Sequence, residues 1–251
     1  MAEPQTVVDT APALNGHRPG PARPLPSVLI ATRHGESTAN VEFALAAETG
    51  ALTVPITCRD ADIPLSLQGR SQAQRLGEWW AALPPADRPR SVWCSPYLRT
   101  ADTARTALAQ ASGLGAVPVG LPVRFDERLR DRELGVLEML TQAAIEKEHP
   151  AEAARRRKMG ELYYRPPGGE SFLDVALRVR SCLRDICEEE AGHPVLIVSH
   201  DCPVLMLRYV LDRLTEPELL ALPPVRNCST SLWRSDGTRL GPEQWNAVDH
   251  L

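Results

Sequence analysis

Two histidines of this chain each follow a run of apolar residues. His34 and its neighbour Arg33 come directly after residues 28–32, VLIAT, and His200 follows residues 195–199, VLIVS. Such runs are typical of buried strands, and the carboxyl ends of parallel strands form the usual ligand site of open α/β folds. An imidazole and a guanidinium at one sheet edge suit a phosphoryl group, so we predict a phosphate site there.

Phosphoryl transfer needs a nucleophile, cations that hold the non-bridging oxygens, and an acid for the leaving oxygen. The neutral imidazole of His34 is a competent nucleophile near pH 7, because the unperturbed pKa of histidine is about 6.5. Arg33 lies beside it, His200 closes the site from its own strand end, and residues 95–100, SPYLRT, open a helix that brings Arg99 to the same edge. None of these roles requires a metal, and no Asp/His cluster suggests one, so we expect no metal and no other cofactor.

These residues have to be positioned by alternating strands and helices. Apolar periodicity and capping residues predict strands at 27–33, 91–94 and 195–199, a short edge strand within 225–235, and helices at 67–83, after residue 97, within 141–165, at 171–191 and at 203–214. We expect a helix fragment and a long loop over 37–62, and a loop from Arg124 to Gly135. The alternation predicts an α/β sandwich with a mainly parallel central sheet.

The chain divides into a tail and one domain. Residues 1–26 contain six prolines and almost no apolar periodicity, which predicts a disordered tail. We expect residues 27–251 to form a single domain, with a helical insertion at about 136–170 near the active site. The basic run 155–158, RRRK, fits either a solvated helix face or a cover over the mouth of the pocket.

Six segments of the sequence resemble the histidine phosphatase superfamily (branch 1), which has the phosphoglycerate mutase-like fold. They occur in the family's order and span about residues 27–235. The resemblance implies a three-layer α/β/α sandwich and metal-independent chemistry through a phosphohistidine. The matching segments are 32–40 TRHGESTAN, 64–73 PLSLQGRSQA, 95–104 SPYLRTADTA, 126–131 DERLRD, 169–171 GES and 198–200 VSH.

The resemblance also implies roles for particular residues. His34 looks like the residue that becomes phosphorylated, and Arg33, Arg99 and His200 look like the phosphate clamp. Asn40 looks like an additional phosphate ligand. Each of these residues occupies the matching position of its motif in this chain.

The general acid departs from the family's pattern. The family usually places a Glu four residues before a Gly, and counting back from Gly135 gives Asp131 instead. Its shorter side chain has to lie about one methylene closer to the leaving oxygen, because proton transfer needs heavy atoms about 2.6–3.2 Å apart. We favour Asp131 over its neighbours Glu127 and Glu133 on register. Asp201 follows the second histidine where the family often has Gly, and it either orients His200 or faces solvent.

Composition excludes several classes of function. The 251 residues carry a net charge of −4, so general attraction to nucleic acid is not expected. We find neither a secretory signal nor an apolar stretch that could span a bilayer, so no membrane association is expected. The six cysteines lack metal-ligand spacing, which predicts reduced thiols in a cytoplasmic protein. They are Cys58, Cys94, Cys182, Cys187, Cys202 and Cys228.

We therefore predict a cytoplasmic phosphomonoester hydrolase that acts on a small phosphorylated metabolite. One alternative is a phosphoglycerate mutase-type phosphotransferase, although the single basic cluster of the insertion favours hydrolysis. Another is a non-catalytic binding or regulatory member of the same fold, an alternative that the replacement of the acid by Asp131 leaves open. A homodimer is compatible with the sequence, which identifies neither the substrate nor the oligomeric state.

Overall fold

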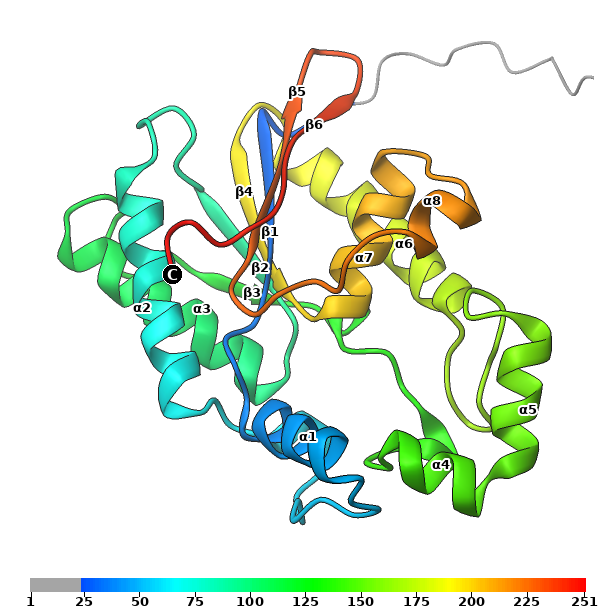
Figure 1. Cartoon of the computed structure of the whole chain (residues 1–251). Helices are drawn as coiled ribbons and strands as arrows, with labels where there is room; N and C mark the ends of the chain where they lie inside the picture. Colours follow the sequence, from blue (N-terminus) through cyan, green and yellow to red (C-terminus); the bar gives the residue numbers. More distant parts are fainter. Residues whose placement is uncertain (1–23) are drawn as a thin grey trace, which may run out of the picture.

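The computed structural model describes residues 24–251, which form a six-stranded sheet with helices on both faces (Figure 1). The strand order is β3-β2-β4-β1-β5-β6. The pairs β1/β4, β2/β4 and β2/β3 are parallel, and β1/β5 and β5/β6 are antiparallel. The strands are β1 Val28–Arg33, β2 Ser91–Cys94, β3 Val123–Phe125, β4 Pro194–Ser199, β5 Thr230–Ser235 and β6 Leu240–Ala247.

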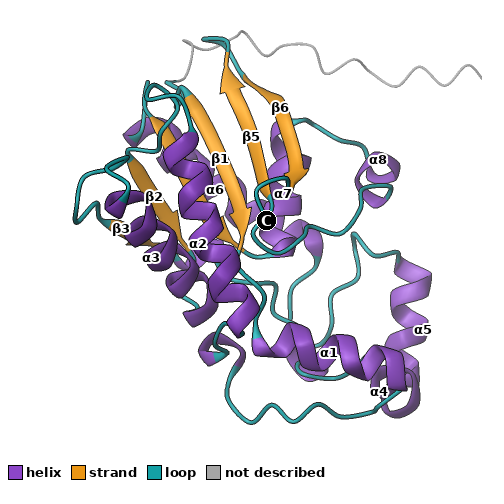
Figure 2. Cartoon of the chain, turned by 60° about the vertical axis from the view of Figure 1, so that its left-hand side comes forward, coloured by secondary structure: helices purple, strands orange, loops and turns teal. Residues whose placement is uncertain are grey.

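Two helical layers enclose this sheet. Helices α2 and α3 cover one face, and α6 and α7 cover the other (Figures 1 and 2). The three-layer sandwich and the mainly parallel sheet expected from the sequence are confirmed. The helices are α1 Thr38–Thr49, α2 Leu67–Ala82, α3 Leu98–Gly113, α4 Gln142–Glu148, α5 Pro150–Met159, α6 Phe172–Glu189, α7 Asp201–Leu211 and α8 Glu216–Leu220.

Serine side chains cap the N-termini of α2 and α6. Ser66 Oγ accepts the backbone N–H of Gly69 at the start of α2. Ser171 and Asp174 form a reciprocal capping box at the start of α6. Each cap satisfies backbone donors that have no partner inside the helix, which fixes where the helix begins.

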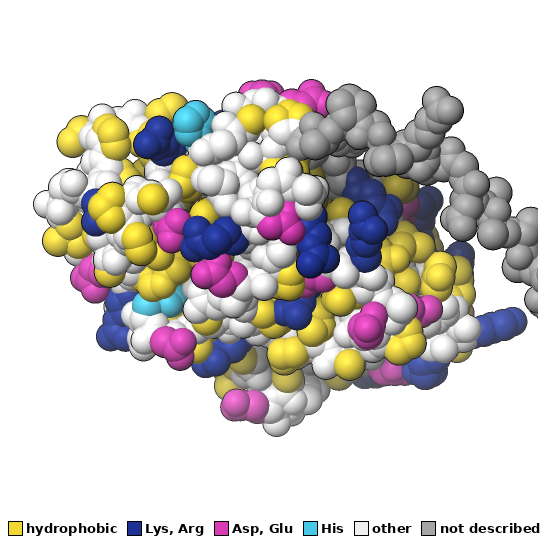
Figure 3. Space-filling view, turned by 90° about the horizontal axis from the view of Figure 1, so that it is seen from above, with side chains coloured by type: hydrophobic (Ala, Val, Ile, Leu, Met, Phe, Trp, Pro, Cys, Tyr) yellow, Lys and Arg dark blue, Asp and Glu magenta, His cyan; other side chains and the backbone are white. Residues whose placement is uncertain are grey.

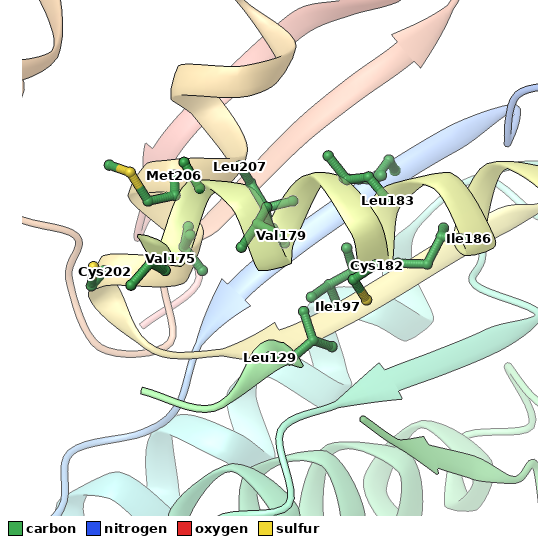
Figure 4. Packing of buried hydrophobic residues seen from close by; sticks show 14 of the residues in the cluster. Leu129, Val175, Val179, Cys182, Leu183, Ile186, Ile197, Cys202, Met206 and Leu207 are labelled. Atoms are coloured by element: carbon green, nitrogen blue, oxygen red, sulfur yellow. The ribbon is translucent and has the colours of Figure 1, made fainter. Parts of the chain in front are cut away.

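The two helical layers pack on opposite sides of the same strands. In β1, Leu29 and Ala31 belong to the core cluster beneath α6 and α7, whereas Val28 and Ile30 belong to the cluster beneath α2 and α3. This alternation follows from the two-residue period of a strand, and it explains why a strand buried on both faces reads as one continuous apolar run. Figure 4 shows the first cluster, in which α6 lies over β4 and contributes Val175, Val179, Cys182, Leu183 and Ile186.

Several expected boundaries were wrong. The strand expected within 225–235 is not at the edge, because β5 lies between β1 and the unpredicted β6. The unpredicted β3 takes the first residues of the expected loop 124–135. The helical stretch 141–165 is two helices, since Pro150 begins α5 after a break at His149, and the expected 203–214 helix begins at Asp201.

Most of the expected disordered tail, residues 1–23, lies outside the described residues. Two residues assigned to that tail are part of the fold: Leu25 packs against the core, and Pro26 is buried. The carbonyl oxygen of Leu25 accepts the backbone N–H of Gly192 at 2.8 Å, which ties the chain to the turn before β4. Leu25 and Pro26 therefore belong to the packed domain.

Within residues 24–251, we find no helix long and apolar enough to cross a membrane. On the face shown in Figure 3, Lys and Arg side chains are interspersed with Asp and Glu. Mixed charge of this kind does not form the single-sign field that attracts a polyanion.

Candidate active site

The two strand-end histidines lie together at the carboxyl ends of β1 and β4. The backbone N–H of His34 donates to the carbonyl oxygen of Ser199 at 2.9 Å, which extends the parallel pairing of these strands by one residue. The imidazole rings of His34 and His200 are 5.1 Å apart between centroids, and both side chains are buried. The sheet thus brings together two residues that are 166 positions apart in the sequence.

Hydrogen bonds identify which nitrogen of His34 carries the lone pair. Nδ1 lies 2.6 Å from the carbonyl oxygen of Gly35, and a carbonyl only accepts, so Nδ1 carries the hydrogen in the neutral ring. On the other side of the ring, Arg99 Nε donates to Nε2 at 3.2 Å. Because Arg99 only donates, Nε2 presents its lone pair, as a nucleophile must.

The charge state of His34 suits this role. Burial lowers its pKa well below the usual value of 6.5, and the charges of His200, Arg99 and Arg33 lower it further. The ring is therefore neutral at pH 7. A neutral imidazole has a free lone pair, whereas an imidazolium does not.

Arg99 stands in the centre of the site, on the first turn of α3. Its terminal nitrogens donate to the backbone oxygen of Asp60 at 2.6 Å, to the Asp60 carboxylate at 3.1 Å and to Asp131 Oδ2 at 3.0 Å. The side chain is 4% exposed, so these charge-assisted bonds act with little screening. Two carboxylates thus flank the guanidinium.

His200 is held by groups on opposite sides of its ring. Nε2 lies 2.8 Å from Ser95 Oγ at the end of β2, and Nδ1 lies 3.3 Å from Asp131 Oδ2. Burial lowers the pKa of His200, while the nearby Asp131 carboxylate partly restores it. Apart from this contact with Asp131, Nδ1 has no hydrogen-bond partner among the described residues.

Asp131 is the carboxylate that the fold brings to the histidines. Burial alone would raise its pKa, but His200 and Arg99 together hold the pKa well below its usual range. Its two rivals lie elsewhere: Glu127 and Glu133 are exposed, and Glu133 pairs with Arg130 at 2.9 Å. Neither rival lines the cavity at His34, whereas Asp131 does.

Arg33 and Asn40 also line this cavity. Arg33 donates from a terminal nitrogen to the carbonyl oxygen of Val225 at 2.8 Å, and its buried Nε has no partner among the described residues. Asn40 Oδ1 accepts the backbone N–H of Ser37 and the side-chain N–H of Asn227. Among residues 24–251 its amide nitrogen has no such partner, so it can donate to a ligand.

The cavity has a volume of about 490 Å³. Arg33, His34, Arg99 and Asp131 line it at the phosphate site. Most of the rest of the lining comes from α1, from α7, from the segment between Leu134 and Tyr164, and from Phe172, Pro224 and Val225. Figures 1 and 2 show α4 and α5 of this segment standing away from the sheet, across from α1. In the basic run 155–158, only Arg156 lines the cavity, and Glu161 binds it through two hydrogen bonds of 2.6 Å.

The sequence reasoning missed two acidic residues that line the cavity, Asp60 and Glu138, and it missed Asn227, whose side chain donates to Asn40. Asp60 lies in the long loop after α1, Glu138 follows a short 3-10 turn, and the Asn227 amide donates to the carbonyl oxygen of His34 at 3.0 Å. Glu138 is half-buried, and burial raises its pKa. The only signal in the sequence was an acidic residue within the loop expected over 37–62, for Asp60, and within the insertion expected at 136–170, for Glu138.

Other expectations concerned metals and thiols. Over residues 24–251, no three His, Cys, Asp or Glu side chains are grouped so that they could hold a metal ion. Cys94 and Cys228 are buried thiols without a disulfide, and burial raises the pKa of each to about 12. Asp201 lines the cavity, and its carboxylate accepts the backbone N–H of Cys202 at the start of α7.

Comparisons with known proteins agree with this fold. The family model of the histidine phosphatase superfamily (branch 1) matches residues 29–248. The chain is 31% identical over 216 residues to the 2,3-bisphosphoglycerate-dependent phosphoglycerate mutase 2 of Gloeobacter violaceus, covering 84% of this chain and 88% of that protein.

Solved structures are similar over most of their length. Bacillus stearothermophilus YhfR superimposes with a TM-score of 0.71 and 26% identity, covering 89% of this chain and 98% of that one. A mycobacterial glucosyl-3-phosphoglycerate phosphatase in complex with VO3 gives a TM-score of 0.69 and 28% identity, covering 88% and 100%. The chain belongs to the histidine phosphatase superfamily, branch 1, as its six motifs indicated. Its similar proteins include both phosphatases and mutases.

Proposed function

We propose that this protein is a metal-independent phosphomonoester phosphatase that forms a phosphohistidine at Nε2 of His34. The observation that carries the proposal is the state of that ring: a buried, neutral imidazole whose Nδ1–H is fixed by Gly35 and whose Nε2 lone pair lies beside Arg99. Splitting hydrolysis into two displacements through a covalent intermediate replaces one difficult step with two easier ones.

In the first step, His34 Nε2 attacks phosphorus and the bond from phosphorus to the ester oxygen breaks. Arg99, Arg33 and His200 hold the non-bridging oxygens, whose negative charge they stabilise. Asp131 gives its proton to the departing oxygen, so the alcohol leaves neutral. Asp131 is ionised in the free protein, but a phosphate bound beside it adds negative charge and favours its protonated form, and a monoanionic substrate supplies that proton.

In the second step, water attacks the phosphorus of phospho-His34 from the side that the alcohol has left. The Asp131 carboxylate takes a proton from this water, the N–P bond breaks, and inorganic phosphate forms. The electron pair of that bond returns to Nε2, and the neutral ring is restored. Asp131 thus serves first as acid and then as base, because the second displacement is the reverse of the first with water in place of the alcohol.

The two arginines that line the cavity outside the phosphate clamp are already bound by other groups of the protein, which favours hydrolysis over a mutase reaction. A mutase has to hold a second anionic group of its substrate, and this needs cations beyond the phosphate clamp. Arg156 is bound by Glu161, and Arg132 donates to the carbonyl oxygens of Glu170 and Tyr164. Likeness to a phosphoglycerate mutase keeps that reaction as the second candidate.

Release of phosphate from a panel of phosphomonoesters, with EDTA present, tests the proposal. We expect release by the wild type and a loss of at least about 10³-fold in His34→Ala, with no loss in the matched His193→Ala, whose side chain is exposed. The same samples are followed by ³¹P NMR for isomerised ester. Isomerisation without release would establish the mutase, and neither product from any ester would favour the non-catalytic binding or regulatory alternative.

The remaining assignments are part of the same proposal. The substrate is a small-molecule phosphate ester, the location is cytoplasmic, and no metal or other cofactor takes part. A homodimer stays a prediction that sedimentation of the purified protein would check.

A further inference from the structure

The wall of the cavity beyond the phosphate site is largely apolar. Its apolar side chains come from α1, from the turn before α4, from α4 itself and from the first turns of α6 and α7, so segments far apart in the sequence contribute to one surface. These side chains include Phe43, Leu137, Met139, Ile145, Phe172 and Leu205.

The charged groups of this wall disfavour the binding of a second anionic group of a ligand. Apart from the clamp, two arginines line the cavity. Arg132 donates to two backbone oxygens, at 2.7 and 3.2 Å, and stacks over Phe172. Arg156 donates from Nε and from one terminal nitrogen to the carboxylate of Glu161. Glu138 and Asp201 line the same cavity. A carboxylate or second phosphate on the substrate would meet these acids without an unpaired cation to hold it.

One wall residue is held in an unusual backbone conformation. Met139 has a φ of 58°, in the left-handed region that a residue with a side chain rarely adopts. Such strain persists only where surrounding structure enforces it, and it concentrates at ligand sites. It follows Glu138 directly, so this turn supplies an apolar and an acidic group to the wall together.

We propose that this site selects phosphate monoesters of apolar, uncharged alcohols, and that Met139 is a residue that determines this specificity. The inference rests on the proposed function for the phosphate end of the site and adds the class of the leaving group. The apolar part of the alcohol gains free energy by leaving water for the wall, whereas a charged group would lose its hydration without a counterion.

A matched pair of substrates measures this selection. Benzyl phosphate and 4-carboxybenzyl phosphate have the same phosphate ester group, and the second carries an additional carboxylate on the opposite side of the ring. We expect kcat/KM to be at least about tenfold higher for benzyl phosphate, within the range that a pocket achieves by excluding one group. Equal values, or a preference for the carboxylate, would overturn the inference and leave the phosphatase proposal intact.

Two variants at Met139 test whether this residue causes the preference for the uncharged ester. Met139→Lys keeps an unbranched side chain and adds a cation, and it should raise kcat/KM for the carboxylate ester at least about tenfold relative to benzyl phosphate. Met139→Gly removes the side chain but suits the positive φ, so it should fold and lose part of the preference. Arg213→Gly is the control, since Arg213 has a φ of 54° outside the cavity lining.

Binding separates this inference from catalysis. The dissociation constants of benzylphosphonate and 4-carboxybenzylphosphonate, which are not hydrolysed, should differ in the same direction as the two esters. A preference in binding together with no hydrolysis of any ester would overturn the proposed function and keep the selectivity of the cavity. If Met139→Lys changed neither the ratio of kcat/KM values nor the ratio of dissociation constants, Met139 would not be a residue that determines specificity.

Discussion

Arg99 donates a hydrogen bond from Nε to Nε2 of His34 at 3.2 Å, and both side chains are buried at the carboxyl ends of the parallel strands. The donor thus lies against the ring atom that attacks phosphorus in the proposed reaction. In that proposal, the guanidinium passes from the ring nitrogen to the phosphate oxygens when a phosphoryl group enters between them. The same residue would then hold the nucleophile ready and stabilise the charge that the reaction develops.

Replacing Arg99 by Lys should separate charge from geometry. A lysine keeps the positive charge but lacks the planar fork that reaches His34, Asp60 and Asp131 together. We expect kcat/KM for phosphate release to fall by about 10²–10³-fold in Arg99→Lys. Arg75→Lys, on the exposed face of α2, is the control and should match the wild type. Full activity in Arg99→Lys would show that a point charge suffices.

Replacing Asp131 by Asn should reveal a general acid through the leaving group. For an alkyl phosphate, whose alkoxide leaves poorly, we expect kcat to fall by about 10²–10⁴-fold. For 4-nitrophenyl phosphate, whose phenolate leaves without a proton, the loss should be much smaller. Glu133→Gln, at an exposed carboxylate near the same loop, should change neither rate. An equal loss for both esters in Asp131→Asn would assign the residue to positioning instead.

Stability should depend on pH through the two buried histidines. Burial lowers the pKa of His34 and of His200 below the unfolded value of 6.5. As the pH falls from 6.5 toward 5, the unfolded chain binds protons that the folded chain does not, so the free energy of unfolding decreases. Each histidine contributes a slope of up to about 1.4 kcal/mol per pH unit, and above pH 7 the slope from this source vanishes.

Urea unfolding between pH 5 and 8 measures these slopes. His34→Gln and His200→Gln should each flatten the acid side, and His193→Gln, at an exposed position, should leave the slope as it is. An acid slope that survives both buried-site substitutions would mean that other groups cause it.

A backbone contact between two glycines should be sensitive to one added methyl group. A Cβ on Gly69 would lie 2.0 Å from the carbonyl oxygen of Glu36, and a Cβ on Gly35 would lie 2.4 Å from the carbonyl oxygen of Gly69. Gly69→Ala should lower the free energy of unfolding by at least about 1–3 kcal/mol and reduce activity, because the chain at His34 has to move.

Gly113→Ala is the matched control for this contact, since nothing lies within 4 Å of the added atom at the end of α3. It should stabilise the protein by up to about 1 kcal/mol, the difference in helix propensity. Thermal unfolding of both variants provides the comparison. Equal stability of Gly69→Ala and the wild type would show that the two loops part without cost.

Most of the fold followed from the sequence because its strands are buried on both faces. The central strands β1 and β4 read as continuous apolar runs, and Ser66 and Ser171 marked where helices begin. In contrast, β6 carries Gly241 and Pro242 and has five half-buried positions, so no apolar period marks it. Proline is tolerated there because β6 is an edge strand.

The site residues at strand ends could be placed, since parallel strands converge at one edge. Asp131 was placed only by its register to Gly135, through resemblance. Asp60 could not be placed, because its contact with Arg99 depends on how the loop after α1 folds back. The place of Glu138 and Met139 in the cavity wall could not be predicted either, because a turn with one positive φ leaves no pattern in the sequence.

The central claim is that His34 carries the phosphoryl group during turnover. The most direct test mixes the enzyme with excess phosphate ester, quenches in alkali within milliseconds, and locates phosphate on peptides by mass spectrometry. We predict an alkali-stable, acid-labile phosphate on Nε2 of His34, which is absent in His34→Ala and forms at a rate no slower than kcat. Phosphate release with no phosphorylated His34 at any time, or phosphate on another residue that forms at the rate of turnover, would contradict this account.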